Sequence, residues 1–138
     1  PIIGETVLTS QKVIELAGEA ANGAVAHVGL TADAPQPLIK KFSDSFVAEY
    51  KSKSDHNGLK GYSGMYIVKA VTEKIGKVDS KAFAAAMKGI SLAVKDHPGI
   101  LMDVSFDANG DLDRESYMTK VENGKQVVSA ILPPVNRK

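Results

Sequence analysis

The chain contains no cysteine, and its opposite charges almost cancel. Without cysteine it has no disulfide, no thiolate metal ligand and no cysteine nucleophile. The 17 Lys and Arg residues face 16 Asp and Glu residues, so a net charge of +1 creates no strong field for nucleic acid or an anionic membrane. No apolar run approaches the ~20 residues that a membrane-spanning helix needs. We therefore expect no nucleic-acid partner and no thiol chemistry.

The length suits one domain of ordinary composition. The chain has 138 residues, of which 43% are apolar and 24% charged, as in globular proteins. It opens with PIIGE, which holds neither an initiator Met nor the basic and apolar regions of a signal peptide. Because Ile2 and Ile3 are typical of the end of a buried strand, we expect a chain cut from a larger protein.

No constellation of catalytic or metal-binding residues is visible. The segment from Asp107 to Asp113 alternates like a calcium loop, but Leu112 and Met118 stand where an EF-hand needs glycine and glutamate. This segment instead favours a turn whose side chains bond their own backbone. The histidines are far apart in sequence, at His27, His56 and His97. An enzyme is therefore the least expected class, and we expect no metal and no cofactor.

Four segments carry apolar residues at helical spacing, bounded by capping and stop residues. The clearest begins at Pro37, after which apolar residues recur every four positions from Leu38 to Tyr50. The polar stretch from Lys51 to Gly58 predicts a surface loop. The expected helices cover residues 10–21, 37–50, 61–75 and 80–88, and Asp79 or Ser80 is expected to cap the last of them.

Short apolar segments between and after these helices predict strands. Residues 24–28 read as one strand, and the alternating residues 100–106 read as a half-buried one. Residues 116–121 and 126–131 flank Asn123-Gly124, which predicts a tight hairpin. Helices and strands along one chain indicate the α/β fold class.

Glu5 follows a glycine at the end of the first expected strand. A carboxylate at a strand end lies at the rim of the sheet, where α/β proteins bind ligands. It could hold a ligand ammonium through a charge-assisted hydrogen bond of ~1.5–3 kcal/mol. The other interpretation is an exposed glutamate without a ligand role.

The order of these elements resembles the last third of a bacterial solute-binding protein of the Leu/Ile/Val-binding type, which serves ABC importers. The resemblance covers nearly the whole chain. Its motifs are residues 16–23 (LAGEAANG), the helix opening near Tyr62, and residues 75–79 (IGKVD), 106–113 (FDANGDLD) and 120–125 (KVENGK). It implies a segment of the type I periplasmic-binding-protein fold, a two-lobed, Rossmann-like three-layer sandwich, here with about four helices, short strands and a C-terminal hairpin.

The resemblance also implies a function. The chain would be the C-terminal portion of the extracytoplasmic binding component of an ABC importer, with an amino acid, branched-chain in this family, as its solute. Its partner would be the membrane permease. The precursor would carry a signal peptide, and the mature protein would be periplasmic or extracellular, or lipid-anchored.

By this resemblance Glu5 would hold the α-ammonium of a bound amino acid. A second contact in the family comes from the loop before the helix near Tyr62, where an aromatic residue is usual and this chain has Asn57. We therefore expect Glu5, Asn57 and Tyr62 to bind the ligand, and the departure at Asn57 leaves other small solutes open. Because further contacts come from an N-terminal part of the family, we expect this chain alone to bind amino acids poorly.

The two lobes of the family would divide the chain. Residues 1–28 and 107–138 would belong to the second lobe, and residues 29–106 to the first. Neither lobe would be complete, and open sheet edges invite pairing with another copy. We therefore expect a homo-oligomer joined through open sheet edges.

The alternative function is a stand-alone or sensory α/β domain of a signalling receptor, whose polar turn and hairpin meet a protein partner. The upstream sequence separates the two. A signal peptide and a further lobe would support the importer component, and an initiator Met directly before Pro1 would support the stand-alone domain.

Overall fold

The computed structural model describes residues 2–135 and divides there into two compact units. Residues 1 and 136–138, which we assigned to the second lobe, lie outside the described residues. The first unit comprises residues 2–56 and 115–133, and the second comprises residues 57–114 with residues 134 and 135. How these segments divide between the lobes of a larger receptor stays a prediction.

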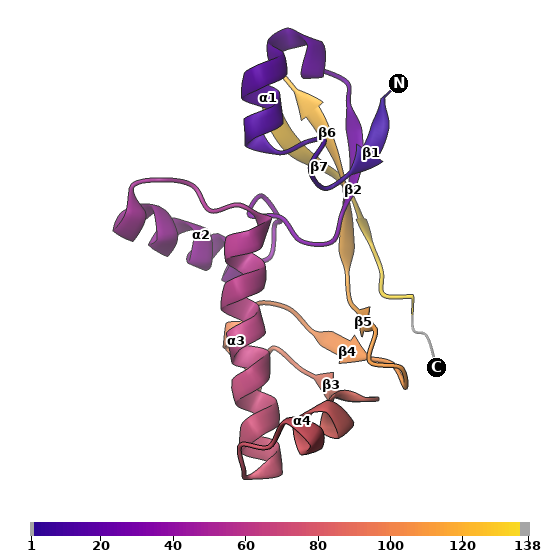
Figure 1. Cartoon of the computed structure of the whole chain (residues 1–138). Helices are drawn as coiled ribbons and strands as arrows, with labels where there is room; N and C mark the ends of the chain where they lie inside the picture. The colour runs from indigo at the N-terminus through magenta and orange to yellow at the C-terminus, as the bar shows by residue number, and fades with distance from the viewer. Residues whose placement is uncertain (1, 136–138) are drawn as a thin grey trace. The chain divides into compact units, whose positions relative to one another are not determined.

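The first unit is built on a four-stranded sheet, with α1 beside it in Figure 1. The strand order is β1-β2-β6-β7, in which β1 and β2 are parallel and the other neighbours antiparallel. The elements of this unit are β1 (Ile3–Glu5), α1 (Gln11–Ala17), the 3-10 helix η1 (Gly18–Ala21), β2 (Val25–Val28), α2 (Pro37–Tyr50), β6 (Ser116–Glu122) and β7 (Lys125–Leu132). The mixture of helices and strands confirms the α/β class.

One face of this sheet is buried and the other is open. Tyr117, Thr119 and Val121 of β6 are buried, while the residues between them are only half-buried. Ala26 of β2 pairs with Thr119 and is buried on the same face, because side chains alternate along strands. Ile14 of α1 packs in a cluster with Val121. The core of the first unit therefore lies between α1 and this one face.

A chain of hydrogen bonds on the buried face joins separate segments. Gln126 Nε2 donates to the carbonyl and hydroxyl oxygens of Thr9, both at 2.8 Å, and Thr31 Oγ1 donates to Gln126 Oε1 at 2.8 Å. The hydroxyl oxygens of Thr9 and Thr119 lie 2.8 Å apart, and Thr119 Oγ1 donates to Ala26 O at 3.3 Å. Since Thr9 and Thr119 are fully buried, these bonds replace their bonds to water. The network fixes the loop after β1 and the segment after β2 against the hairpin.

The second unit contains two helices and a small antiparallel sheet among the described residues. Its strands lie in the order β3-β4-β5. The elements are α3 (His56–Ile75), which begins at the last residue of the first unit's N-terminal segment, α4 (Ser80–Met87), β3 (Ser91–Leu92), the 3-10 helix η2 (Pro98–Ile100), β4 (Val104–Phe106) and β5 (Leu112–Asp113). Among the described helices, none combines the length and the apolar character that crossing a membrane requires.

Several local predictions are confirmed. The hairpin of β6 and β7 turns at Asn123 and Gly124, whose φ angles of 51° and 71° are those that a tight Asn-Gly turn needs. Asp79 caps α4, because its Oδ1 accepts from Ala82 N at 2.8 Å, and this bond lowers the pKa of Asp79. Asp107 Oδ1 accepts two backbone N–H groups of its own turn, at 2.8 and 2.9 Å.

Three element boundaries differ from prediction. The third helix begins at His56, so the end of the predicted loop 51–58 is wrong. The first helix ends at Ala17, because Gly18 takes a φ of 57° and the chain continues as a 3-10 helix. The strand expected over residues 100–106 is reduced to its last three residues, since Leu101 adopts a left-handed φ of 69°.

Two predictions of burial are also wrong. The first strand forms, but Ile2 and Ile3 are 62% and 70% exposed, because β1 lies at an edge of the sheet. Leu16, at helical spacing with buried residues, is 77% exposed. Local periodicity identified the elements but not which faces are covered.

Replacing Gly99 with alanine is expected to destabilise the second unit. A Cβ atom there would lie 2.2 Å from Tyr66 Cγ, so the tyrosine ring would have to move, and overpacking of this kind costs ~1–3 kcal/mol. Urea unfolding followed by circular dichroism measures the change. The control is Gly61→Ala in α3, where a Cβ would meet open space. There alanine is expected to raise the free energy of unfolding by ~0.5–1 kcal/mol, because glycine is unfavourable inside a helix. Equal shifts for both variants would contradict the contact.

Replacing Gln126 with leucine is expected to lower the free energy of unfolding by ~1–3 kcal/mol. The change removes the hydrogen bonds of the Gln126 amide to the Thr9 carbonyl and the Thr31 hydroxyl. A buried polar group that loses its partner destabilises the folded state by about this amount. The control is Gln11→Leu, whose amide donates to exposed Glu15 at 3.3 Å and whose loss should cost no more than ~0.5 kcal/mol. If urea unfolding gave the same value for both variants, the network would not carry this stability.

Candidate functional site

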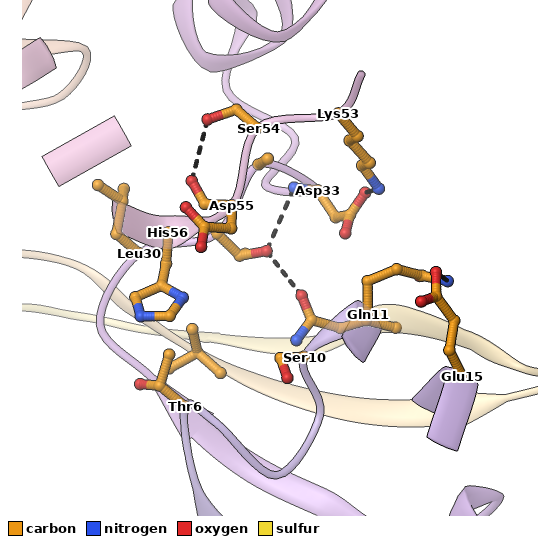
Figure 2. A pocket seen from close by; sticks show the side chains of 14 residues that line it. Thr6, Ser10, Gln11, Glu15, Leu30, Asp33, Lys53, Ser54, Asp55 and His56 are labelled. Carbon is orange, nitrogen blue, oxygen red and sulfur yellow. Dashed lines mark hydrogen bonds and ion pairs between the residues drawn. The ribbon is translucent and has the colours of Figure 1, made fainter. Parts of the chain in front are cut away.

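A cavity of about 320 Å³ lies within the first unit, beyond the carboxyl ends of β1 and β2. Four segments distant in sequence form it, and Figure 2 shows their side chains around the same space. The lining residues are Thr6, Ser10, Gln11, Glu15, Val28, Leu30, Thr31, Ala32, Asp33, Lys53, Ser54, Asp55, His56 and Gln126. This is the region of an α/β sheet in which ligands commonly bind.

One wall of the cavity is held by the buried hydrogen-bond network. Thr31 and Gln126 both line the cavity, and the hydrogen bond between their side chains is part of this network. Thr31 Oγ1 also accepts from Asp33 N at 3.3 Å, which orders the segment after β2. Val28 and Leu30 are buried and supply an apolar surface beside these polar groups. The wall therefore combines fixed polar groups with apolar side chains, as small-molecule sites do.

The lining carries charges of both signs. Lys53 forms an ion pair with Asp33, and Figure 2 shows these two side chains facing each other. Glu15 on α1 and Asp55 add further carboxylates, and His56 adds an imidazole. Such a lining suits a small polar solute that itself carries charge. Across residues 2–135, no three His, Cys, Asp or Glu side chains converge in a way that could hold a metal ion.

Glu5 is exposed at the end of β1, where the sequence placed it. It is not among the lining residues, although Thr6, which follows it, is. Glu5 pairs in register with His27, so its side chain belongs to the open face of the sheet. Gly4 lies on the opposite face, since a Cβ there would meet the side chain of Leu8. Glu5 therefore lies next to the cavity along the chain and on the rim of the sheet.

Asn57 and Tyr62 lie on α3 in the second unit, so neither unit contains all three predicted residues. Asn57 directly follows His56, a lining residue of the cavity. Tyr62 is 40% exposed, and its ring centroid lies 5.0 Å from that of Tyr66. A hydrogen bond with the Tyr66 side chain, and then burial, raises the pKa of Tyr62, so its phenol stays protonated at neutral pH.

Sequence reasoning missed this cavity, because none of the three residues predicted to bind the ligand lines it. Thr31 and Asp33 fall between the strand expected over residues 24–28 and the helix expected from Pro37, and Lys53 falls in the expected surface loop. The available signal was their position, because polar residues that follow a buried parallel strand lie at the sheet rim. Gln126 gave no such signal, since it is one polar residue in a hairpin strand. Its role appears only when the network is seen.

Residues 2–126 of the chain match the family described as periplasmic binding protein. No match was found among curated proteins. The matched region covers nearly all of both compact units.

Solved structures of this kind are similar along the whole chain. A leucine binding protein from Thermotoga maritima shares 22% identity at a TM-score of 0.79, over 99% of this chain and 38% of that one. A solute binding protein of an ABC transporter from Rhodopseudomonas palustris, in complex with 3,4-dihydroxy benzoic acid, shares 26% identity at a TM-score of 0.78, over 97% and 37% of the two chains. A second R. palustris solute binding protein, in complex with benzoate, shares 24% identity at a TM-score of 0.76, over 100% and 38%.

These structures confirm the expected fold, a segment of the type I periplasmic-binding-protein fold. The chain spans less than two fifths of each similar structure, since it covers 37–38% of their lengths. Because the family match extends over residues 2–126, the chain belongs to the periplasmic binding protein family.

Proposed function

We propose that this chain is the C-terminal portion of the solute-binding component of an ABC importer. The solute we propose is a small carboxylate, and among small carboxylates an amino acid is the first candidate. The observation that carries the proposal is the family match over residues 2–126, joined to a cavity lined by charges of both signs. The protein acts by binding rather than by catalysis. Its partner is a membrane permease, and its place is outside the cytoplasmic membrane, free or lipid-anchored.

The chemistry of the cavity supports a charged solute. The similar structures carry the names leucine, 3,4-dihydroxy benzoic acid and benzoate, and each of these compounds has a carboxyl group. Here Lys53 and His56 lie in a lining that also carries the carboxylates of Glu15, Asp33 and Asp55, and Asp33 is the ion-pair partner of Lys53. An amino acid presents both groups on one carbon and therefore uses both signs of charge. A benzoate carries only the carboxylate and would use one sign of charge.

Glu5 is assigned the ammonium group of the solute. It is exposed at the carboxyl end of β1, and a charge-assisted hydrogen bond there would contribute ~1.5–3 kcal/mol. Asn57 and Tyr62 are assigned contacts from α3. The amide of Asn57 suits a polar part of the solute better than an aliphatic side chain.

The chain alone is expected to bind leucine only at millimolar concentration, and Glu5→Gln is expected to weaken this binding by roughly 10- to 150-fold. The amide keeps the size of the glutamate but removes the charge that holds the ammonium group. Isotope-edited NMR titration of the 138-residue chain with leucine measures the affinity. Micromolar affinity would contradict the proposal that the chain carries only part of the pocket.

Two controls separate the ammonium contact from general weakening. Glu15→Gln removes a lining carboxylate on α1 and should change leucine affinity less than Glu5→Gln does. N-acetyl-leucine has no ammonium group, so its residual binding should not depend on residue 5. If Glu5→Gln weakened both ligands equally, the assigned role of Glu5 would be wrong.

A further inference from the structure

The sequence contains four Asn-Gly pairs, which begin at Asn22, Asn57, Asn109 and Asn123. In an Asn-Gly pair the asparagine readily loses its side-chain amide, because glycine has no side chain to hinder the attack of its own backbone nitrogen. This nitrogen attacks only after it has lost its proton, so an acceptor that holds the glycine N–H slows the reaction. The hydrogen bonds of the glycines therefore decide which pair reacts first.

Three of the pairs are held by backbone structure. Gly23 N donates to Val121 O at 2.9 Å, which ties it to β6, and Gly110 N donates to Asp107 O at 3.0 Å within its own turn. The pair Asn57-Gly58 lies in the first turn of α3, where the helix must open before the side chain can react with the backbone. At all three pairs, backbone bonds must break before the glycine nitrogen can attack.

The fourth glycine nitrogen is held by a side chain instead. Gly124 N donates to Asn22 Oδ1 at 3.1 Å, although the two residues are 102 positions apart in the sequence. Asn22 and Asn123 are both exposed. Rotation of the Asn22 side chain therefore releases the N–H of Gly124 while the backbone bonds of the β6–β7 hairpin stay in place. The reaction at Asn123 has the smallest structural barrier of the four.

We propose that Asn123 is a site of spontaneous deamidation and that the side chain of Asn22 sets its rate. Gly124 N attacks Asn123 Cγ and forms an N–C bond, while the Cγ–Nδ2 bond breaks and the departing amide takes up the N–H proton and leaves as ammonia. Water then adds to a carbonyl of the resulting cyclic succinimide and opens it to aspartate or isoaspartate. Water is the co-reactant, and no electrons are transferred.

The modification changes the turn that joins β6 to β7. Asn123 and Gly124 form this turn with φ angles of 51° and 71°. Isoaspartate carries the backbone through its β-carbon, so it lengthens a loop whose length fixes the register of the hairpin. Gln126, which bonds to the Thr9 carbonyl, lies close behind the turn in β7. The site is independent of the proposed solute contacts, since neither residue of the turn lines the cavity.

Replacing Asn22 with alanine tests the role of its side chain, because the change removes the acceptor and keeps the Asn123-Gly124 pair. Loss of one neutral hydrogen bond changes an equilibrium by roughly 2- to 10-fold, so residue 123 is expected to deamidate faster by about this factor. Asn22→Asp keeps an oxygen acceptor at the same position and should react no faster than the wild-type chain. Peptide mapping by mass spectrometry during incubation at neutral pH measures aspartate and isoaspartate at each pair.

Two controls separate this contact from general unfolding. Asn109 lies in the second unit, so its rate should be the same in the wild-type chain and in both variants. In concentrated urea, the wild-type chain and Asn22→Ala should react equally fast at residue 123, because the bond exists only in the folded chain. An unchanged rate at residue 123 in folded Asn22→Ala, an equal rise at Asn109, or the same rise in Asn22→Asp would overturn the proposal. So would a wild-type chain in which another Asn-Gly pair reacts first.

Discussion

The side-chain amide of Gln126 is the interaction on which the first unit depends. It donates to the Thr9 carbonyl and hydroxyl oxygens and accepts from Thr31, each at 2.8 Å. A primary amide is suited to this position because it donates and accepts at once. Since Thr9 and Thr31 are buried, removing the amide would leave polar groups that water does not reach. The same residues fix the segments that line the cavity, so the stability of the unit and the shape of the site have one cause.

The sheet itself is unusual for its strand pairing. Parallel strands are normally covered on both faces, and their sequences are then apolar on both sides. β1 is parallel to β2, yet Ile3 in the strand and Ile2 directly before it are exposed. The chain also spans 37–38% of the similar solved structures. The two isoleucines are therefore exposed because β1 lies at an edge of the sheet.

Sequence patterns predicted what local chemistry decides. The Asn123-Gly124 turn, the Asp79 cap and the helix after Pro37 each depend on a few neighbouring residues, and all three are present. The patterns failed where the backbone had alternatives, as at Leu101, whose left-handed conformation no periodicity signals.

Predictions of burial and of the site failed for a different reason. Leu16 fits a helical stripe but is exposed, because its burial depends on which other segments cover that face. The cavity combines residues 6–15, 28–33, 53–56 and 126, and only the complete fold brings them to one place. The place of Glu5 at a strand end could be predicted from sequence, because a strand end is a local feature. Thr31, Lys53 and Gln126 could not, since each is an ordinary polar residue until its distant partners are known.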